Sequence, residues 1–459
     1  MKTILFNLTV HLFIIFYFTA AANAAALYQN DNQSAEFIRT INRSASTEID
    51  AAYYNPAGLS MLKDNGLFIY FSNQVISQTR EVRDSSNDIV QHVGSGSSVT
   101  YTGEASTLIY PTGYIVYKND GRAFYCHLSI VGAGVAADFD NGLPGFDSMS
   151  IMSAKGTLAG LYGESLTDYK SDNSFDVRAV MYGITAGGSY SLSKKISVAL
   201  GIRHIIAVQD SHLSMRFKSI LGNSGTTLSD IRTDYGYFTD VDIESQATGR
   251  CNGIIAGIDF VPVSTVNIGL KCEYYSTLEL ENRKPERYIA PVNLSGLLET
   301  QFGEGIKIKK TLPASFSMGI SWMALARLKI ESSFSYFFNR VTDWGTDSSG
   351  ESISEKFNNG FGFGLALEYA LFPRLRTSAG GTWSVSGRTR EVRSEGEFDP
   401  PCLTIGCGAT CTFSSDIELT VAGMRVFFHE LQGTAMSDDQ AVSIPSTWNF
   451  AIGATYRVL

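Results

Sequence analysis

The stretch "FGFGLALEY" (residues 361–369) shows an alternation that recurs along the chain. Large apolar or aromatic side chains occupy every second position, and Gly, Ala or Glu occupies the positions between them. Three further stretches follow the same pattern, "ISVALGIRHIIAV" (196–208), "VNIGLKCEYY" (266–275) and "TWNFAIGATYRVL" (447–459). Because successive side chains of a strand point to opposite faces, each stretch predicts a β-strand with one apolar and one polar face.

The length of these strands separates a soluble sandwich from a membrane barrel. Strands of soluble proteins usually run about five or six residues, whereas the alternation here persists over nine to thirteen. Lipid can cover the apolar face of such strands, and closure of the sheet leaves no unpaired backbone edge in the hydrocarbon. We therefore predict an all-β fold, a transmembrane antiparallel β-barrel in the bacterial outer membrane.

The composition agrees with a barrel and argues against nucleic acid as a partner. The 459 residues include 43 Gly, 22 Tyr and 28 Phe but only 11 Pro, a mixture expected of long aromatic-rich strands. The formal charge is −9, and no basic stripe is visible.

The first 24 residues predict a secretory signal peptide. Lys2 precedes an apolar run over residues 4–18, and "ANA" (22–24) fits a small-x-small cleavage pattern. No later stretch of about twenty apolar residues occurs, so no membrane-spanning helix is expected.

Candidate strands number about fourteen, an even number as bacterial barrels have. Short connections such as 191–195 and 260–264 alternate with long polar ones, which predicts periplasmic turns and extracellular loops. The candidate strands are 67–78, 106–117, 123–137, 178–191, 196–209, 248–260, 265–278, 313–323, 326–338, 358–369, 374–384, 403–412, 417–428 and 447–459. The expected long loops are 79–105, 138–177, 210–247, 279–310, 339–357, 385–402 and 429–446.

The six cysteines predict neither a disulfide nor a metal site. Alternation places Cys251 and Cys272 on opposite faces of neighbouring strands, where their side chains cannot meet. The three cysteines of segment 402–411 have no nearby His and no paired C-x-x-C.

Residues 25–65, which precede the barrel (66–459), lack the two-residue period. "QSAEFIRTINRSASTEIDAAYYNPAGLSML" (33–62) combines helical spacing of apolar residues with an Asn-Pro-Ala-Gly turn. Such a segment is too short to bury a core alone, so it either trails into the periplasm or folds inside the barrel. Its moderately apolar composition favours a small helical hatch inside the lumen.

Three stretches carry a resemblance to a known family. "AYYNPAGLS" (52–60), "LIYPTGYIVYKNDGRAFYCHLSIVGAGVAADFDNG" (108–142) and, more weakly, "TLPASFSMGISWMA" (311–324) resemble the FadL-like outer-membrane transporters of long-chain fatty acids and other hydrophobic compounds. The resemblance spans essentially the whole mature chain.

The resemblance implies a monomeric channel without a cofactor, whose hatch plugs the lumen. Hydrophobic molecules, most often long-chain fatty acids, would enter from an extracellular groove, reach a lumenal pocket and leave sideways into the membrane. The implied hatch motif is Asn55, Pro56, Ala57 and Gly58, and the implied third-strand kink is Gly132, Ala133 and Gly134. Pro111, which cannot donate to a ladder, predicts a weak point in the neighbouring second strand.

Other residues are candidates for contact with a ligand. Segment 138–177 is rich in apolar side chains, which either pack against other loops or line the entrance groove. The candidate groove residues are Leu143, Phe146, Met149, Met152, Leu158 and Leu161. Alternation turns Arg203 and Lys271 into the lumen, where they could pair with a ligand carboxylate or remain solvated charges.

Several features mark a divergent member and leave alternatives open. Ala133 replaces a bulky aromatic residue, "EFIRTINRSAST" (36–47) replaces a glycine-rich run, and the chain does not end in Phe. A general polar porin or a structural barrel is the alternative function. Enzymatic activity is not expected, because the histidines accompany no nucleophile motif such as G-x-S-x-G.

Overall fold

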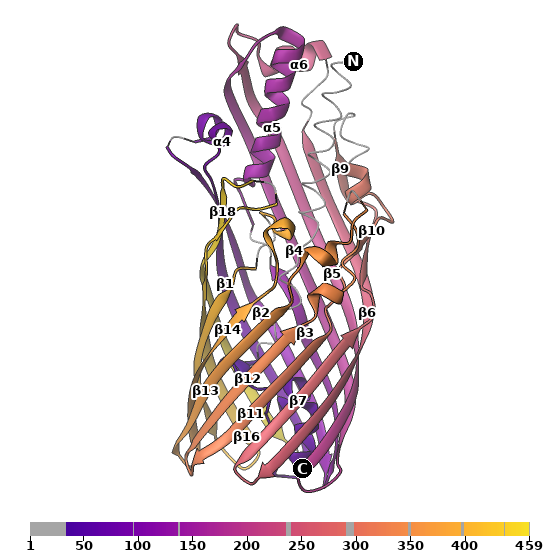
Figure 1. The fold of residues 1–459 in the computed structure, drawn as a ribbon, viewed down its shortest axis with the longest axis vertical. Coiled ribbons are helices and arrows are strands. Elements are labelled where there is room, and N and C mark those ends of the chain that lie inside the picture. The colour runs from indigo at the N-terminus through magenta and orange to yellow at the C-terminus, as the bar shows by residue number, and fades with distance from the viewer. Residues whose placement is uncertain are drawn as a thin grey trace.

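The computed structural model describes residues 34–94, 96–135, 138–235, 240–290, 298–347, 350–395, 399–435 and 437–458. The predicted signal peptide (1–24) and the start of the predicted hatch (25–33) lie outside these ranges. The described residues form a closed antiparallel barrel with short turns at one end and long extensions at the other (Figure 1).

Fourteen long strands make the wall, which confirms the predicted number and order. The last strand closes the barrel by pairing with the first, from Phe68↔Arg457 to Asp84↔Gln440. The wall strands are β1 (Gly66–Asp84), β2 (Val99–Asn119), β3 (Arg122–Val135), β4 (Leu166–Ser191), β5 (Ile196–Gly222), β6 (Val241–Val263), β7 (Val266–Tyr275), β11 (Ser315–Leu325), β12 (Leu328–Phe337), β13 (Gly360–Phe372), β14 (Leu375–Val385), β15 (Cys402–Thr412), β16 (Ile417–Phe428) and β18 (Gln440–Arg457).

The predicted bounds of several loops were wrong in part, because strands continue into these segments. β4, β5 and β6 are 26, 27 and 23 residues long and extend into segments 138–177 and 210–247. β1 and β2 likewise extend into segment 79–105. Above the membrane the outer face meets water, as at the exposed Lys218–Asp172 ion pair, so the apolar period fades while the backbone ladder continues.

Small elements complete the long-loop end of the barrel. The short strands are β8 (Glu279–Asn282), β9 (Arg287–Ile289), β10 (Lys307–Lys309) and β17 (Leu431–Gln432). The helices there are α4 (Asn87–His92), α5 (Pro144–Thr157), the π-helix η3 (Leu158–Tyr162), α6 (Leu228–Tyr235) and the 3₁₀ turns η4 (Asn339–Val341), η5 (Ile353–Lys356) and η6 (Arg390–Val392). No helix in the described ranges has the length and apolar character that a membrane crossing requires.

The two faces of the wall differ as the alternation predicts. On β13, Phe363 is 56% exposed on the outer face, whereas Gly364 and Glu368 are buried on the inner face. The exposed large apolar side chains of the other strands extend this outer band around the barrel. All six cysteines are free, with Cys251 buried and Cys272 exposed, as the alternation predicted.

Candidate functional site

Residues 34–62, called the hatch from here on, lie inside the barrel. They form α2 (Ala35–Ile38), α3 (Ala51–Tyr54) and the 3₁₀ helix η2 (Pro56–Met61). All residues of α2 and α3 are buried. Hydrogen bonds to inward-facing side chains fix the two ends of the hatch, from Ala35 N to Ser72 Oγ at 3.0 Å and from Ser191 Oγ to Ser60 Oγ at 3.1 Å.

The hatch lies against a row of glycines in the wall. A Cβ atom at any of them would lie 3.4 Å or less from a hatch atom, and at most of them it would overlap the hatch. From Ala35 to Ala57 the hatch passes along the wall strands in reverse order, from β18 back to β6. These eight residues, called the glycine belt, are Gly257, Gly269, Gly319, Gly364, Gly380, Gly406, Gly408 and Gly453. Glycine therefore allows the hatch backbone to approach the wall directly.

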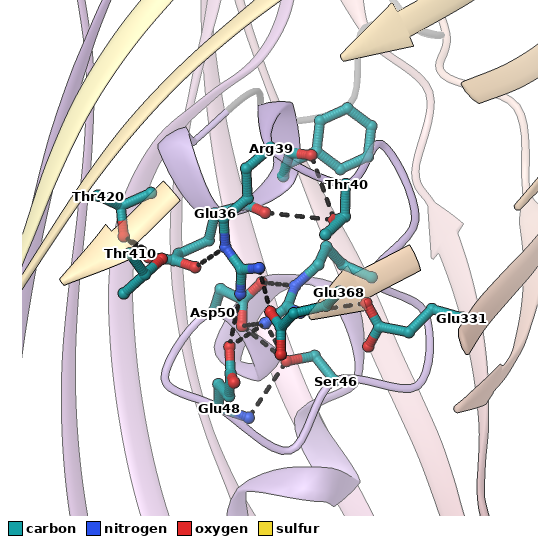
Figure 2. Close-up of polar contacts among 12 residues, drawn as sticks. Glu36, Arg39, Thr40, Ser46, Glu48, Asp50, Glu331, Glu368, Thr410 and Thr420 are labelled. Carbon is teal, nitrogen blue, oxygen red and sulfur yellow. Dashed lines mark hydrogen bonds and ion pairs between the residues drawn. The ribbon is translucent and has the colours of Figure 1, made fainter. Parts of the chain in front are cut away.

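Ion pairs hold the same part of the hatch to the wall, as Figure 2 shows. Glu48 is the central acid, and its Oε2 lies 3.1 Å from Arg39 and 2.6 Å from Arg43. Arg39 also pairs with Glu368 of β13, and Arg43 lies 3.4 Å from Glu331 of β12. The members of this ion-pair cluster are Glu36, Arg39, Arg43, Glu48 and Asp50 of the hatch and Lys329, Glu331, Glu368, Arg376 and Glu418 of the wall.

The cluster keeps Arg39, Arg43 and Glu48 charged. Burial alone would lower the pKa of Arg39 and Arg43, but the surrounding carboxylates raise it well above its ordinary value. Burial alone would raise the pKa of Glu48, but Arg376, Arg43 and the other nearby cations hold it well below its usual range. The carboxylate of Glu48 is therefore ionised at neutral pH.

The predicted hatch motif lies at the β5–β6 side of the lumen. The amide of Asn55 donates to Ser46 O at 3.0 Å and to the carboxylate of Asp259. Pro56 begins η2, so the expected turn is a 3₁₀ helix, and Ala57 O accepts from Ser197 Oγ at 2.7 Å. All four motif residues are buried.

Arg203 and Lys271, the candidate partners of a ligand carboxylate, face the lumen and are already paired with the carboxylate of Glu273. Arg203 is 1% exposed, and its Nη1 lies 3.1 Å from Glu273 and 2.6 Å from Tyr275 Oη. Lys271 Nζ lies 2.9 Å from the other Glu273 oxygen and donates to Tyr53 O at 3.0 Å. Both cations also lie over the Tyr53 ring, 4.9 and 5.1 Å from its centroid. This arrangement ties the hatch to β5 and β7.

A cavity of about 240 Å³ lies in the lumen against the hatch. Its lining is uncharged over most of its extent and combines apolar side chains of the hatch and wall with many hydroxyl groups. Phe37, Ile41 and Tyr54 contribute the hatch side, and Ile76 and Tyr110 contribute the side formed by β1 and β2. No three His, Cys, Asp or Glu side chains in the described residues are grouped to hold a metal ion.

The pairing between β2 and β3 is incomplete. It runs from Asn119↔Arg122 at the short-turn end only as far as Gly113↔Leu128. Beyond this point, the next pairing within the described residues is the isolated bridge between Glu104 of β2 and Asp138, which follows β3. We call the unpaired stretch, residues 105–112 of β2 and 129–135 of β3, the seam. Since the N–H of Tyr110 points to β1, Pro111 lacks the donor that would face β3.

Both edges of the seam carry a bulge. The β1–β2 register shifts between Thr107 and Tyr110, which leaves Leu108 and Ile109 exposed on the outer face at 73% and 74%. The β3–β4 register shifts between Ile130 and Gly132, so Val131 is the extra residue. The break therefore precedes the predicted kink by one residue, and the Gly132–Ala133–Gly134 backbone pairs regularly with β4.

Two buried apolar side chains meet across the seam. Tyr110 and Ile130 pack against each other from opposite edges in a cluster separate from the main core. Ile76 and Val180 of the flanking strands cover them in part. Because Tyr110 also lines the cavity, the lumenal space reaches the inner side of the seam.

The candidate groove residues of segment 138–177 divide into two groups. Leu143, Phe146, Met149 and Leu158 are buried within the main hydrophobic core, so the protein itself occupies their surfaces. Met152 is partly exposed and Leu161 is exposed, and a role in an entrance groove stays a prediction for these side chains. Asp147 of α5 is buried and accepts hydrogen bonds from Tyr101, Tyr169, Ser171 and Asn173.

Comparison with solved structures finds channels of the same architecture. A FadL homologue of Pseudomonas aeruginosa superimposes with a TM-score of 0.62 at 15% identity, over 95% of this chain and 100% of that chain. The Pseudomonas putida toluene transporter TodX gives 0.59 at 12% identity, over 94% and 100%. The Ralstonia pickettii toluene transporter TbuX gives 0.52 at 12% identity, over 95% and 98%.

Comparisons of the amino-acid sequence find no match. No protein-family model matches the chain, and no curated protein sequence matches it. The likeness shown by these comparisons therefore rests on the superposition of the coordinates, which covers 94–95% of this chain and 100% of the first two structures. The chain has the fold of the FadL-type outer-membrane channels.

Proposed function

We propose that the protein is a passive outer-membrane channel for small hydrophobic compounds. The observation that carries this proposal is the position of Tyr110, which lines the lumenal cavity and also fills the seam. At the seam, a molecule in the cavity is thus separated from the outer face of the barrel by side-chain packing, including that of Tyr110 on Ile130, rather than by a hydrogen-bonded ladder. Side-chain rotation costs far less than breaking strand pairs, so the seam is the favoured exit.

The position of the hatch favours exit through the barrel wall over passage along the barrel axis. The glycine belt and the ion-pair cluster fix it across the lumen on the short-turn side of the cavity. Compounds enter from the long-loop end, occupy the cavity and leave between β2 and β3 into the membrane. The step runs down a gradient of chemical potential, because apolar molecules are more stable in hydrocarbon than in water.

Charge pairing favours neutral compounds over long-chain fatty acids as substrates. A fatty-acid carboxylate at Arg203 or Lys271 would have to displace Glu273, which bridges both cations. Two of the similar channels are named as toluene transporters, and CymD, with a TM-score of 0.51 at 12% identity, is named as a monoaromatic hydrocarbon channel. Long-chain fatty acids, the class that the sequence resemblance suggested, form the competing substrate class.

Accumulation of labelled compounds tests the proposal. Cells that express the protein are compared with cells carrying the empty vector for uptake of labelled toluene and labelled oleate, and the purified protein is tested in liposomes for passage of a small sugar. We expect faster toluene uptake, a smaller effect on oleate and no sugar passage. Sugar passage without any gain in uptake of either hydrophobic compound would identify a polar porin instead.

A further inference from the structure

Arg425 is a cation on the lipid-facing side of the barrel. Along β16 the outward positions carry apolar residues, among them Leu419, Val421 and Phe427, which are all exposed. Arg425 occupies the same row and is half-buried. A charged side chain on the lipid face destabilises a barrel at the membrane midplane and is tolerated near the interfaces. Its depth in the membrane therefore decides what it can do.

The register places Arg425 at the outer edge of the membrane. It is the ninth residue of β16 counted from the short turn, and a tilted strand needs about 9–11 residues to cross the hydrocarbon. Trp448 of β18 lies directly opposite, and Phe427 and Trp383 are exposed on the same outer face. Aromatic side chains form such girdles where the hydrocarbon meets the head groups. Short turns face the periplasm, so this girdle faces the outer leaflet.

The guanidinium of Arg425 lies over two aromatic rings, and no acidic partner pairs with it among the residues that the structure describes. Its Cζ atom lies 4.7 Å from the Phe427 ring centroid and 4.6 Å from that of Trp448. Its Nε is buried without a hydrogen-bond partner, and none of the ion pairs within the described residues includes it. By contrast, Arg178 on the outer face of β4 lies 3.4 Å from Asp176. Stacking holds the guanidinium plane but leaves the N–H donors of its two Nη groups available to an anion.

The surroundings of Arg425 become polar toward the loops. Ser77 of β1 is paired with Trp448 and is exposed on the outer face, and Ser446 lies two residues beyond Trp448 on the same face. Hydroxyl groups at this height can donate to an anion that the guanidinium holds. An anion that reaches a lipid-facing arginine at this depth must belong to the membrane or enter from its surface.

We propose that Arg425 binds a phosphate group of an outer-leaflet glycolipid, with Phe427 and Trp448 orienting the guanidinium. Arginine donates two parallel hydrogen bonds to phosphate, and the neighbouring low-dielectric phase strengthens them. This site lies on the outer wall and does not depend on the proposed transport function.

Thermal unfolding in mild detergent tests the site. The wild type, Arg425→Gln and the matched control Arg178→Gln are each heated with bisphosphorylated lipid A, with dephosphorylated lipid A and with inorganic phosphate alone. We expect bisphosphorylated lipid A to raise the unfolding temperature of the wild type and the control more than the dephosphorylated form does. Arg425→Gln should lose most of this difference. Arg425→Lys keeps the positive charge but not the two parallel N–H donors of the guanidinium, so it should keep part of the difference.

Two results would overturn the proposal. One is an equal phosphate-dependent shift in Arg425→Gln and the wild type, which would leave the arginine a purely structural stacking residue. The other is a shift of the same size with inorganic phosphate alone, which would remove the glycolipid as its source. If Arg425→Gln does not fold, the wild type and Arg425→Lys decide: equal shifts with the two forms of lipid A in both proteins would contradict the site.

Discussion

The hatch and the seam are held by different physical means. The hatch lies on eight glycines that admit its backbone and is tied to the wall by buried ion pairs. The seam lacks the backbone ladder that joins neighbouring strands elsewhere in the wall and is filled mainly by Tyr110 and Ile130. Local opening in proteins follows local stability, so the seam is expected to open at far lower cost than the hatch is displaced.

The comparison also separates the roles of glycine in this barrel. On the glycine belt, glycine removes side chains so that a second layer of backbone can lie against the wall. Near the seam, Gly132 follows a bulge, which interrupts the pairing of β3 with β4. Glycine thus allows close packing in the belt, whereas at the seam the extra residue of the bulge is Val131 and the glycine after it pairs regularly.

The largest expected effect comes from adding a side chain to the glycine belt. A Cβ atom at Gly364 would overlap Asn42 and Thr382, whereas a Cβ atom at Gly362, two residues away on the same face, would meet nothing nearer than 3.7 Å. We expect Gly364→Val to lower the free energy of unfolding by about 3 kcal/mol and Gly362→Val by less than about 1 kcal/mol. Thermal unfolding in detergent measures both, and equal losses in the two variants would contradict the belt.

The next effect is the loss of the central acid of the ion-pair cluster. Glu48→Gln leaves Arg39 and Arg43 short of a carboxylate, so we expect a loss of about 1.5–3 kcal/mol. Asp172→Asn removes the exposed partner of Lys218 and should cost less than about 1 kcal/mol. Denaturant unfolding of the two variants decides whether the buried pairs fix the hatch more strongly than a surface pair could.

The ion-pair cluster also predicts a pH dependence with a definite sign. Because the folded pKa of Glu48 lies below its unfolded value of about 4.3, its contribution is complete above that pH and is lost as the pH falls through the folded pKa. The stability difference between wild type and Glu48→Gln should stay constant from pH 8 to about 5 and shrink below about 4.3. A difference that vanished already at pH 6 would contradict this account.

The smallest loss of stability is expected at the seam, where the same substitution should also speed transport. Tyr110→Ala removes one of two buried side chains from a small cluster, so we expect a loss of roughly 1 kcal/mol and faster uptake of labelled toluene. Tyr114→Ala, on the same strand within the paired region, serves as the control and should not accelerate uptake. Unchanged uptake in Tyr110→Ala would remove the seam from the route.

Much of the wall could be predicted from the sequence, because alternation is a local signal. The alternation of neighbouring residues is enough to place Phe363 on the outer face and Gly364 on the inner face, and the same pattern predicts fourteen strands. The extensions of β4, β5 and β6 could not be predicted in this way. Their outer faces meet water, and polar residues on both sides of a strand produce no period.

The site depends on contacts between distant segments and was predicted less completely. Gly364 was placed on the inner face, but only the fold shows that Asn42 lies against it. The candidates Arg203 and Lys271 were placed in the lumen, but their pairing with Glu273 depends on the register of three strands. Pro111 and the glycines of β3 lie within the seam, and such residues are local signals because they act on the backbone directly. The lateral opening at Gly132–Gly134 stays a prediction.

The most direct test fixes each region in turn and measures transport. In a background without native cysteines, Ser44→Cys with Ser333→Cys ties the hatch to the wall, where Ser44 N lies 3.3 Å from Ser333 Oγ. Tyr110→Cys with Ile130→Cys, joined by a short bifunctional thiol-reactive reagent such as a bis-methanethiosulfonate, closes the seam. We expect toluene uptake to continue with the hatch tied and to stop with the seam closed. Uptake that stops with the hatch tied and continues with the seam closed would contradict the account.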